Sequence, residues 1–294
     1  MSACATWGCR PCPCRCSKVY LAHFGLNQAP FGITPDTEFI YPSNSHREGL
    51  NLLNLALASG EGFIKVVGEV GTGKTLLCRN FLAELGPDWK AAYLPNPQME
   101  PRAFLREVAD EIGISAGAPE ASHIVKRLNL RLLDLARTDQ KVVLCIDEAQ
   151  TMPRLTLESL RLLSNLETEK RKLLHIVLFG QPELDDMLAA HSARQIRQRI
   201  AFNHRLRGLD LDEVGHYIAQ RLRIAGHNGD PLLSRAAVRA LHRQSGGTPR
   251  LVNILAHKAL LAAFGEGRQQ VDARHARIAA KDTEGAKQAS WWPW

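Results

Sequence analysis

Short apolar runs alternate with longer amphipathic stretches through the first two thirds of the chain. The apolar runs are rich in aliphatic and β-branched side chains and predict strands at 63–67, 90–94, 141–146, 174–179 and 200–206. Between them, leucines recur at helical spacing and predict helices at 46–58, 76–85, 101–113, 121–137, 155–166 and 183–190, the first capped by Ser45. Strands that alternate with helices predict an α/β fold over residues 46–207, a three-layer αβα core with a parallel sheet.

The pattern changes after residue 207. Amphipathic stretches at 211–225, 234–244, 249–264 and 272–280 predict a small all-helical lid domain over 208–281. Ahead of the core, residues 19–45 combine aromatic side chains with prolines, which predicts an extended N-terminal arm. Its aromatic rings either anchor the arm on the domain surface or flank an adenine ring. Residues 282–294 end in tryptophans and predict a flexible tail.

The loop after the first predicted strand has the G-x-x-x-x-G-K-[ST] spacing of a phosphate-binding loop, between a strand and a helix. Backbone N–H groups of such a loop and the positive end of the next helix bind phosphate oxygens. We expect ATP to be bound here, with Lys74 on the β- and γ-phosphates and Thr75 as a ligand of Mg²⁺. The expected binding residues are Gly68, Glu69, Val70, Gly71, Thr72, Gly73, Lys74, Thr75 and Leu76.

An acidic pair, Asp147 and Glu148, follows the apolar run at 141–146. A continuous apolar run predicts a strand buried on both faces of a parallel sheet, so the pair is expected at the edge where ligands bind. Hydrolysis of a triphosphate needs a metal and a positioned water. We therefore expect Asp147 to hold Mg²⁺ and Glu148 to polarise the attacking water.

Further polar residues are expected to respond to the γ-phosphate. Gln181 follows the predicted strand 174–179 and is either a sensor of that phosphate or a turn residue. Arg199 and then Arg197 are the candidates for an arginine finger that reaches a neighbouring subunit, although basic residues on a helix often form a solvated face. Arg250 follows Gly-Gly-Thr-Pro and is expected to bind the β- and γ-phosphates from the helical domain, or else to be a surface residue.

Composition limits the possible functions only loosely. The chain has 294 residues, a net charge of +7 and a pI near 9.2, which is compatible with acidic partners. No apolar run approaches the roughly 20 residues that span a bilayer, and the N-terminus lacks a secretory pattern. We expect a cytoplasmic protein, free or peripheral at the inner face of the cytoplasmic membrane.

Cysteines are concentrated at the N-terminus, where five of the seven lie within the first sixteen residues. Their spacing lacks the paired C-x2-C arms of a zinc site. Residues 1–18 are therefore interpreted as a disordered or artefactual extension, with a metal site as the alternative. Cys78 and Cys145 are expected to be reduced core residues.

Several blocks in this order resemble the AAA+ ATPases of the ExeA, or general secretion pathway A, type. They are the phosphate-binding loop, Ile146-Asp147-Glu148-Ala149-Gln150, Phe179-Gly180-Gln181-Pro182-Glu183-Leu184, Gln198-Arg199-Ile200 and Ser245-Gly246-Gly247-Thr248-Pro249-Arg250. The arm segments Phe24-Gly25-Leu26, Pro30-Phe31 and Thr34-Pro35 are also typical of that group.

The resemblance implies an ATPase that forms rings or dimers and serves a pilus or secretion apparatus at the inner membrane. Within the group, the chain most resembles the ATPases of mannose-sensitive haemagglutinin (MSHA, type IV) pilus biogenesis, typified by MshM. The secretion members continue into a membrane span and a peptidoglycan-binding part, and this chain ends before either.

Two other functions remain open. Related ATPases accompany transposases and bind DNA. The net positive charge and five arginines of the helical domain fit a DNA-dependent ATPase of that type: Arg221, Arg223, Arg235, Arg239 and Arg243. The third interpretation is a nucleotide-binding switch whose hydrolysis is incidental.

Overall fold

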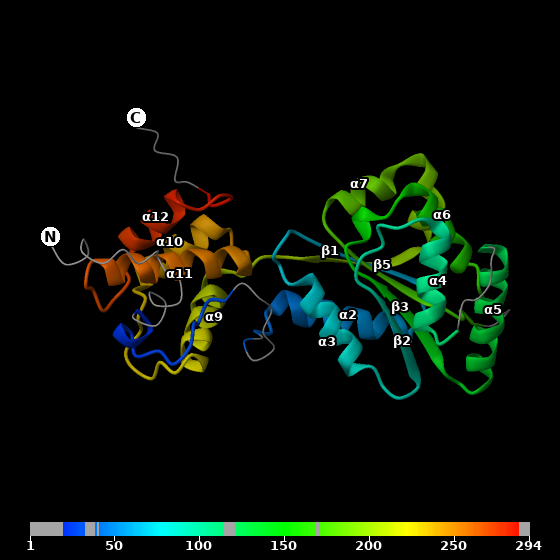
Figure 1. Ribbon diagram of the computed structural model, residues 1–294, viewed down its shortest axis with the longest axis horizontal. Helices are drawn as coiled ribbons and strands as arrows, with labels where there is room; N and C mark the ends of the chain where they lie inside the picture. The colour runs from blue at the N-terminus through cyan, green and yellow to red at the C-terminus, as the bar shows by residue number, and fades with distance from the viewer. Residues whose placement is uncertain (1–19, 33–38, 40, 115–120, 168–170, 288–294) are drawn as a thin grey trace, which may run out of the picture. The chain divides into compact units, whose positions relative to one another are not determined.

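The computed structural model describes residues 20–32, 39, 41–114, 121–167 and 171–287 (Figure 1). Contacts between Cα atoms divide the chain into two units. The core unit holds residues 44–207. The helical unit combines the described residues before Asn44 with those from Gly208 onward. The expected extension at 1–18 and the end of the tail, 288–294, lie outside the described residues.

The core unit is built on a five-stranded parallel sheet. Its strands are β1 (Phe63–Gly68), β2 (Trp89–Leu94), β3 (Lys141–Ile146), β4 (His175–Gly180) and β5 (Ile200–Leu206), in the order β2-β3-β4-β1-β5. Every residue of β4 is buried, as is β3 after its first residue. Burial on both faces explains why these strands are continuous apolar runs in the sequence. The predicted α/β fold with a parallel sheet is confirmed.

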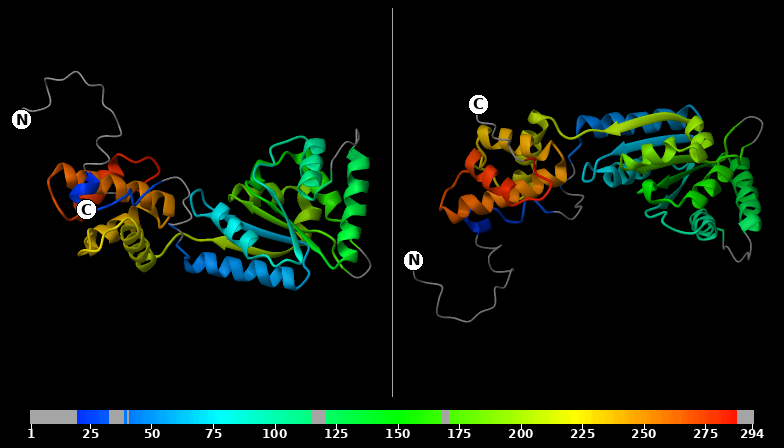
Figure 2. Two further views of the ribbon diagram at one scale, coloured as in Figure 1. Left: turned by 60° about the horizontal axis from the view of Figure 1, so that its bottom comes forward. Right: turned by 90° about the horizontal axis from the view of Figure 1, so that it is seen from above.

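Helices cover both faces of this sheet (Figures 1 and 2). The helical segments of the core unit are α2 (Asn44–Ala58), α3 (Lys74–Glu84), α4 (Pro101–Glu111), α5 (Ala121–Arg137), α6 (Arg154–Leu163), α7 (Glu183–Ala189), α8 (Arg194–Arg199) and the 3-10 turns η2 (Ala149–Thr151) and η3 (His191–Ala193). On one face, Leu53 of α2 and Phe81 of α3 pack in one cluster with Val66. On the other face, a second cluster joins the sheet to α4, α5, α6, α7 and α8. The sheet thus lies between two apolar layers.

Apart from shifts of up to three residues at the ends of elements, two details of the core unit differ from the sequence predictions. The first helix begins at Asn44, so Ser45 lies inside it and is not its cap. The Ser45 Oγ instead accepts a hydrogen bond from the Arg207 N–H at 3.0 Å, which ties α2 to the chain after β5. The short helix α8 was not expected, because Ile196 is its only apolar residue and gives no helical periodicity.

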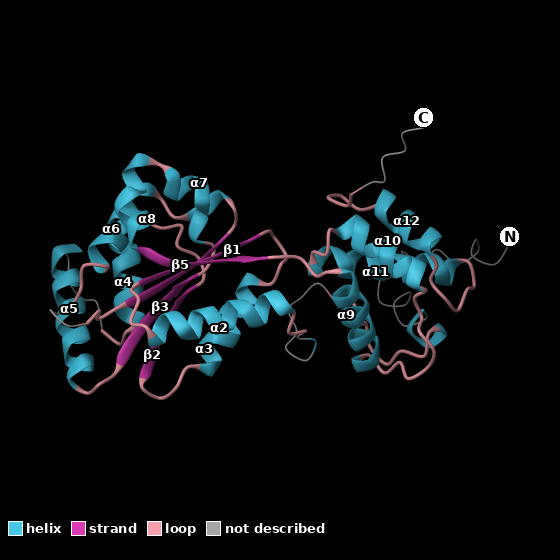
Figure 3. Ribbon diagram, turned by 180° about the vertical axis from the view of Figure 1, so that it is seen from behind, coloured by secondary structure: helices cyan, strands magenta, loops and turns pink. Residues whose placement is uncertain are grey.

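The described residues of the helical unit form helices and loops, whereas all five strands lie in the core unit (Figure 3). Its main helices are α9 (Leu211–Ile224), α10 (Arg235–Ser245), α11 (Pro249–Gly265) and α12 (Ala273–Lys281), each within one residue of its predicted bounds. The side chains of Asp210 and Glu213 form a reciprocal capping box at the start of α9, which fixes where that helix begins.

The N-terminal arm packs into the core of the helical unit. Tyr20, Phe24, Phe31 and Phe39 are all buried, and the first three belong to the same apolar cluster as Val214 of α9. Residues 20–23 are helical rather than extended. Apolar anchoring is therefore the role that the structure supports for these rings.

Arg221, which the sequence suggested as a nucleic-acid contact, is a buried residue of this arm interface. Only 7% of it is exposed. Its Nε donates to the carbonyl of Pro30 at 2.7 Å, its Nη1 donates to the Tyr217 hydroxyl at 2.8 Å, and its guanidinium lies 4.7 Å from the centre of the Phe39 ring. A buried arginine with these partners holds the arm in place and is not available to DNA.

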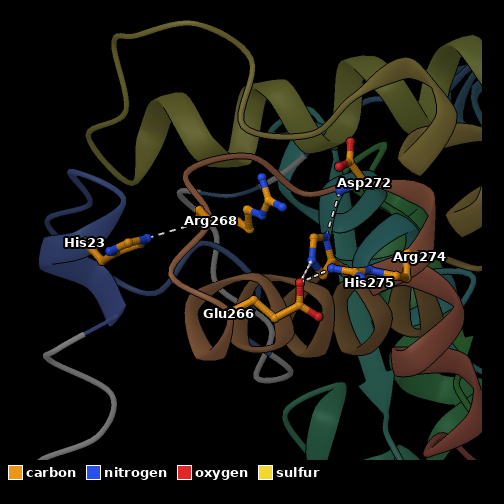
Figure 4. Close-up of polar contacts among 6 residues, drawn as sticks. All are labelled: His23, Glu266, Arg268, Asp272, Arg274 and His275. Atoms are coloured by element: carbon orange, nitrogen blue, oxygen red, sulfur yellow. Dashed lines mark hydrogen bonds and ion pairs between the residues drawn. The ribbon is translucent and has the colours of Figure 1, made fainter.

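A buried histidine joins the last two helices of the unit (Figure 4). The Nδ1 of His275 accepts the Asp272 N–H at 2.9 Å, so its Nε2 carries the proton and donates to Glu266 at 3.0 Å. Arg274 pairs with the same carboxylate. Because His275 lies in the first turn of α12 and Glu266 at the end of α11, this network fixes the connection between them.

The two expected core thiols, Cys78 and Cys145, are buried and free. Among the described helices, none is long and apolar enough to cross a membrane.

Candidate functional site

Three neighbouring strands end at one edge of the sheet, and each is followed by residues that the sequence marked as functional. The phosphate-binding loop follows β1, Asp147 and Glu148 follow β3, and Gln181 follows β4. Since β3, β4 and β1 are adjacent and parallel, their carboxyl ends meet at the same edge. In open α/β sheets this is where ligands bind.

At two positions, the loop between β1 and α3 has a backbone conformation that favours glycine. Gly71 has φ 79° and Gly73 has φ 95°, both in the left-handed region. A Cβ on Gly73 would lie 2.6 Å from Nε2 of His46, so a side chain there would have to displace that imidazole ring. The loop thereby brings its backbone N–H groups to the start of α3, where an anion is favoured.

Lys74 is folded onto the loop that contains it. Its Nζ donates to the carbonyl oxygens of Gly68 at 2.8 Å and Glu69 at 3.1 Å. Burial lowers the pKa of Lys74, and the carboxylates of Glu148 and Asp147 act in the opposite direction. A phosphate at the loop offers this buried ammonium a better acceptor than two neutral carbonyls.

Thr75 and Asp147 lie in direct contact at the base of the loop. The Thr75 hydroxyl donates to Oδ2 of Asp147 at 2.6 Å, and Oδ1 of Asp147 accepts the Glu148 N–H at 2.9 Å. The Tyr93 hydroxyl lies 3.4 Å from the same Oδ2. A hydroxyl and a carboxylate brought together are the oxygen donors that Mg²⁺ prefers, so these residues fit the expected ion.

Tyr93, at the end of β2, was missed by the sequence analysis. Burial, with the Asp147 carboxylate as the next cause, raises the pKa of its phenol to about 12. The hydroxyl therefore stays protonated at neutral pH and acts as a donor to Asp147. Its place was not predictable from the sequence, because it depends on the pairing of β2 with β3.

Glu148 is held by two glutamine side chains. The Nε2 of Gln150 donates to Oε2 of Glu148 at 2.6 Å, and the Nε2 of Gln181 donates to the same oxygen at 3.0 Å. The structure thus brings Gln181 to the carboxylate expected to activate water, which is where a sensor of the γ-phosphate would be placed. The part played by Gln150 was not predicted, although it lies in the Asp-Glu-Ala-Gln block.

The two arginine-finger candidates lie near the amino-terminal ends of the strands, whereas the phosphate-binding loop lies at their carboxyl ends. Arg199 ends α8 directly before β5, and β5 runs parallel to β1 with Ile200 opposite Phe63 and Leu206 opposite Gly68. The length of β5, about 20 Å, therefore separates the two arginines from the phosphate-binding loop. Arg199 is exposed and donates to the hydroxyl of Ser164, and Arg197 is exposed. Neither can therefore reach the loop of its own chain.

Arg250 is exposed on the second residue of α11, in the helical unit. Its contact with the β- and γ-phosphates stays a prediction. Leu76, the last residue of the expected binding set, is half-buried in the first turn of α3.

Residues 57–188 match the family model of an AAA domain. The chain is also 38% identical over 278 residues to general secretion pathway protein A of Aeromonas hydrophila. This similarity covers 93% of the chain, which spans about half, 50%, of the length of that relative.

Solved structures of two archaeal proteins have a similar fold. The fold is similar to that of Cdc6p from Pyrobaculum aerophilum, with a TM-score of 0.62 and 18% identity, covering 85% of this chain and 71% of that one. It is also similar to the ORC2 protein of Aeropyrum pernix, with a TM-score of 0.59 and 18% identity, covering 86% of this chain and 73% of that one. At this identity the likeness shows the fold alone. Together with the AAA domain and the parallel sheet, it shows an α/β fold of the AAA+ type.

Proposed function

We propose that this chain binds ATP with Mg²⁺ and hydrolyses it. The observation that carries the proposal is the convergence of Lys74, the Thr75–Asp147 pair and Glu148 at one edge of the sheet. The AAA domain over residues 57–188 and the similarity to general secretion pathway protein A support it.

Each of the site residues has its own role in phosphoryl transfer. Loop N–H groups and Lys74 bind the phosphates, and Thr75 and Asp147 would hold Mg²⁺, which neutralises phosphate charge when bound. Glu148 accepts a proton from water while the water oxygen bonds to the γ-phosphorus. The bond from that phosphorus to the oxygen bridging to the β-phosphate breaks, and ADP and phosphate are the products.

Release of phosphate from ATP tests the proposal. We expect Mg²⁺-dependent turnover by the purified protein, and a fall of about a hundredfold or more in Glu148→Gln with ATP still bound. Glu107→Gln, the same change on an exposed residue of α4, is the matched control and should keep wild-type turnover. If the wild type releases no phosphate, the proposed function is wrong, and if Glu148→Gln turns over like Glu107→Gln, the water-activating role of Glu148 is wrong.

The arginine finger requires a homo-oligomer. Because Arg199 lies a strand length from its own loop, it serves a phosphate only in a neighbouring copy. Mixing Arg199→Ala with Asp147→Ala should restore part of the turnover that each variant lacks alone, since some interfaces then join an intact loop to an intact arginine. The same mixture can be made with Arg197→Ala. If turnover does not recover at any mixing ratio with either arginine variant, a site shared between subunits is refuted.

For the cellular role, we propose an assembly or energising factor of a pilus or type II secretion-like machine, acting at the inner face of the cytoplasmic membrane. The support is the 38% identity to general secretion pathway protein A. The resemblance to MshM favours the MSHA type IV pilus. Deletion of the gene should abolish pili, with rescue by the wild type and not by Glu148→Gln. Loss of protein secretion with intact pili would favour the secretion machine instead.

A DNA-dependent ATPase is the second candidate, because one helix carries an arginine stripe. Arg235, Arg239 and Arg243 recur every four residues along α10 and are exposed. Such a stripe fits a phosphate backbone. Stimulation of turnover by duplex DNA, with affinity that falls as salt rises and is lost in the triple alanine variant, would establish this function. Absence of both effects would exclude it.

A further inference from the structure

Gln150 is hydrogen-bonded at both ends of its amide, and both partners belong to the candidate site. It lies in η2, two residues after Glu148. Its Nε2 donates to Oε2 of Glu148 at 2.6 Å, and its Oε1 accepts the backbone N–H of Gln181 at 3.0 Å. The side chain therefore links the carboxylate after β3 to the chain after β4.

Two residues beside this link, Gly180 and Glu148, have backbone features that accommodate it. A Cβ on Gly180 would come within 3.2 Å of Oε1 of Gln150 and within 2.6 Å of Leu184, so glycine at this position leaves the space that the amide occupies. Glu148 itself has φ 50° and ψ 38°, a left-handed conformation that is strained for a residue with a side chain. Strained backbone persists only where surrounding contacts hold it, and it is frequent at catalytic positions.

The two glutamines that hold Glu148 are not equivalent. Both donate to Oε2, and Oε1 of Glu148 takes no hydrogen bond from a described residue. In the proposed sensor role, Gln181 turns its amide toward a γ-phosphate oxygen and away from the carboxylate. The hydrogen bond from Gln150 then remains to orient Glu148, with Oε1 open to water.

We propose that Gln150 is a positioning residue, which fixes the orientation of the Glu148 carboxylate and couples it to the backbone of the sensor residue Gln181. The inference rests on the proposed ATP hydrolysis. The role needs an amide, because one end must donate to a carboxylate while the other accepts an N–H. A methionine provides neither, and a glutamate provides only the acceptor.

The experiment compares Gln150→Met with Gln140→Met. The control makes the same change on an exposed residue before β3, at the opposite edge of the sheet. The first readout is amide hydrogen exchange in the protein without nucleotide. Exchange of the Gln181 N–H should become about tenfold faster in Gln150→Met, because it loses its acceptor, and stay unchanged in Gln140→Met.

The second readout is turnover. In Gln150→Met we expect kcat to fall about tenfold to hundredfold, because a misplaced carboxylate activates water poorly, while KM and the Kd for ATP stay within about twofold. A structural role alone would change affinity and thermal stability together with kcat, and that outcome overturns the proposal. A kcat equal to or above that of the wild type also overturns the proposal, because Gln150 would then have no effect on turnover or would slow it.

Gln150→Glu tests the two hydrogen bonds of Gln150 separately, and it replaces Gln150→Met in the experiment if that variant does not fold. Its carboxylate still accepts the Gln181 N–H, so exchange there should stay slow, but it repels Glu148, so turnover should fall. Turnover equal to that of the wild type in Gln150→Glu, with exchange at Gln181 still slow, would refute the orienting hydrogen bond, whereas absence of turnover in the wild type would refute only the ATPase function.

Discussion

The hydroxyl of Thr75 donates to Oδ2 of Asp147 across 2.6 Å, so the first turn of α3 touches the residue that follows β3. The two residues are 72 positions apart in the chain. Their contact places a hydroxyl and a carboxylate side by side next to the phosphate-binding loop. These are oxygen donors of the kind that Mg²⁺ prefers, and in the proposed function both would hold the ion.

Removing the Thr75 hydroxyl should remove the effect of Mg²⁺ on nucleotide binding. In Thr75→Val, which has nearly the same shape, we expect the affinity for ATP with Mg²⁺ to fall about tenfold or more, to the level measured in EDTA. Thr75→Ser keeps the oxygen and should keep the response to the metal. The measurement is a calorimetric titration with ATP, with and without Mg²⁺. If Mg²⁺ strengthens binding equally in Thr75→Val and Thr75→Ser, the hydroxyl is not a ligand.

Gly247 should be indispensable to the helical unit. It has φ 75°, and a Cβ there would lie 2.0 Å from the carbonyl oxygen of Leu209. Gly247→Ala should destabilise this unit by about 3 kcal/mol, because the strained backbone and the steric clash both oppose it. Gly215→Ala is the matched control, since Gly215 lies inside α9 and a Cβ there would be 3.8 Å from its nearest neighbour, the side chain of Val238 in α10. It should be neutral or stabilising by about 0.5–1 kcal/mol.

Amide hydrogen exchange of α10 and α11 reports this effect within the unit itself. Faster exchange in Gly247→Ala, with slower or unchanged exchange in Gly215→Ala, is the expected pair of results. Equal exchange in the two variants would show that the left-handed conformation is not required.

The stability of the core unit should depend on the protonation of His175. This residue is 4% exposed and its Nδ1 donates to the carbonyl of Glu61 at 2.7 Å. Burial lowers the pKa of His175, opposed by that hydrogen bond and assisted by the charge of Lys141. His175 therefore binds a proton more readily in the unfolded chain. Its contribution to stability is fully present above the unfolded pKa of histidine, near 6.5, and is lost as the pH falls toward the lower folded pKa.

Denaturant unfolding between pH 7.5 and 5.5 measures this dependence. Stability of the wild type should fall by up to about 1.4 kcal/mol per pH unit for this one group, and His175→Gln should lose that part of the slope. His216→Gln, at an exposed position of α9, should keep it. An unchanged slope in His175→Gln would contradict the assignment.

The sequence predicts most of the elements of this fold because burial leaves a local pattern. The strand at 141–146 is observed with its predicted bounds, since helices cover both of its faces and force a continuous apolar run. The loop at 68–75 was found from its spacing, which the phosphate chemistry imposes. Helix α8 was missed because one buried side chain, Ile196, gives no periodicity.

The contacts within the site were less predictable, because they depend on strand order. Glu148 meets Gln181 only because β4 lies beside β3, and no local pattern encodes that order. The same limit explains why Tyr93 was missed. Arg221 shows the converse error: a basic residue in an amphipathic helix suggests a solvated face, yet Arg221 is buried and donates to Pro30 of the arm, 191 residues away.

The account depends most directly on uptake of ATP by the loop that contains Lys74. Equilibrium titration of the purified protein with a fluorescent ATP analogue and Mg²⁺ should give saturable binding of one nucleotide per chain. Lys74→Ala should weaken it about a hundredfold or more, because the phosphates lose a buried charged partner, whereas Lys126→Ala, on the exposed face of α5, should bind like the wild type. No saturable binding by the wild type, or equal binding by Lys74→Ala and Lys126→Ala, would contradict it.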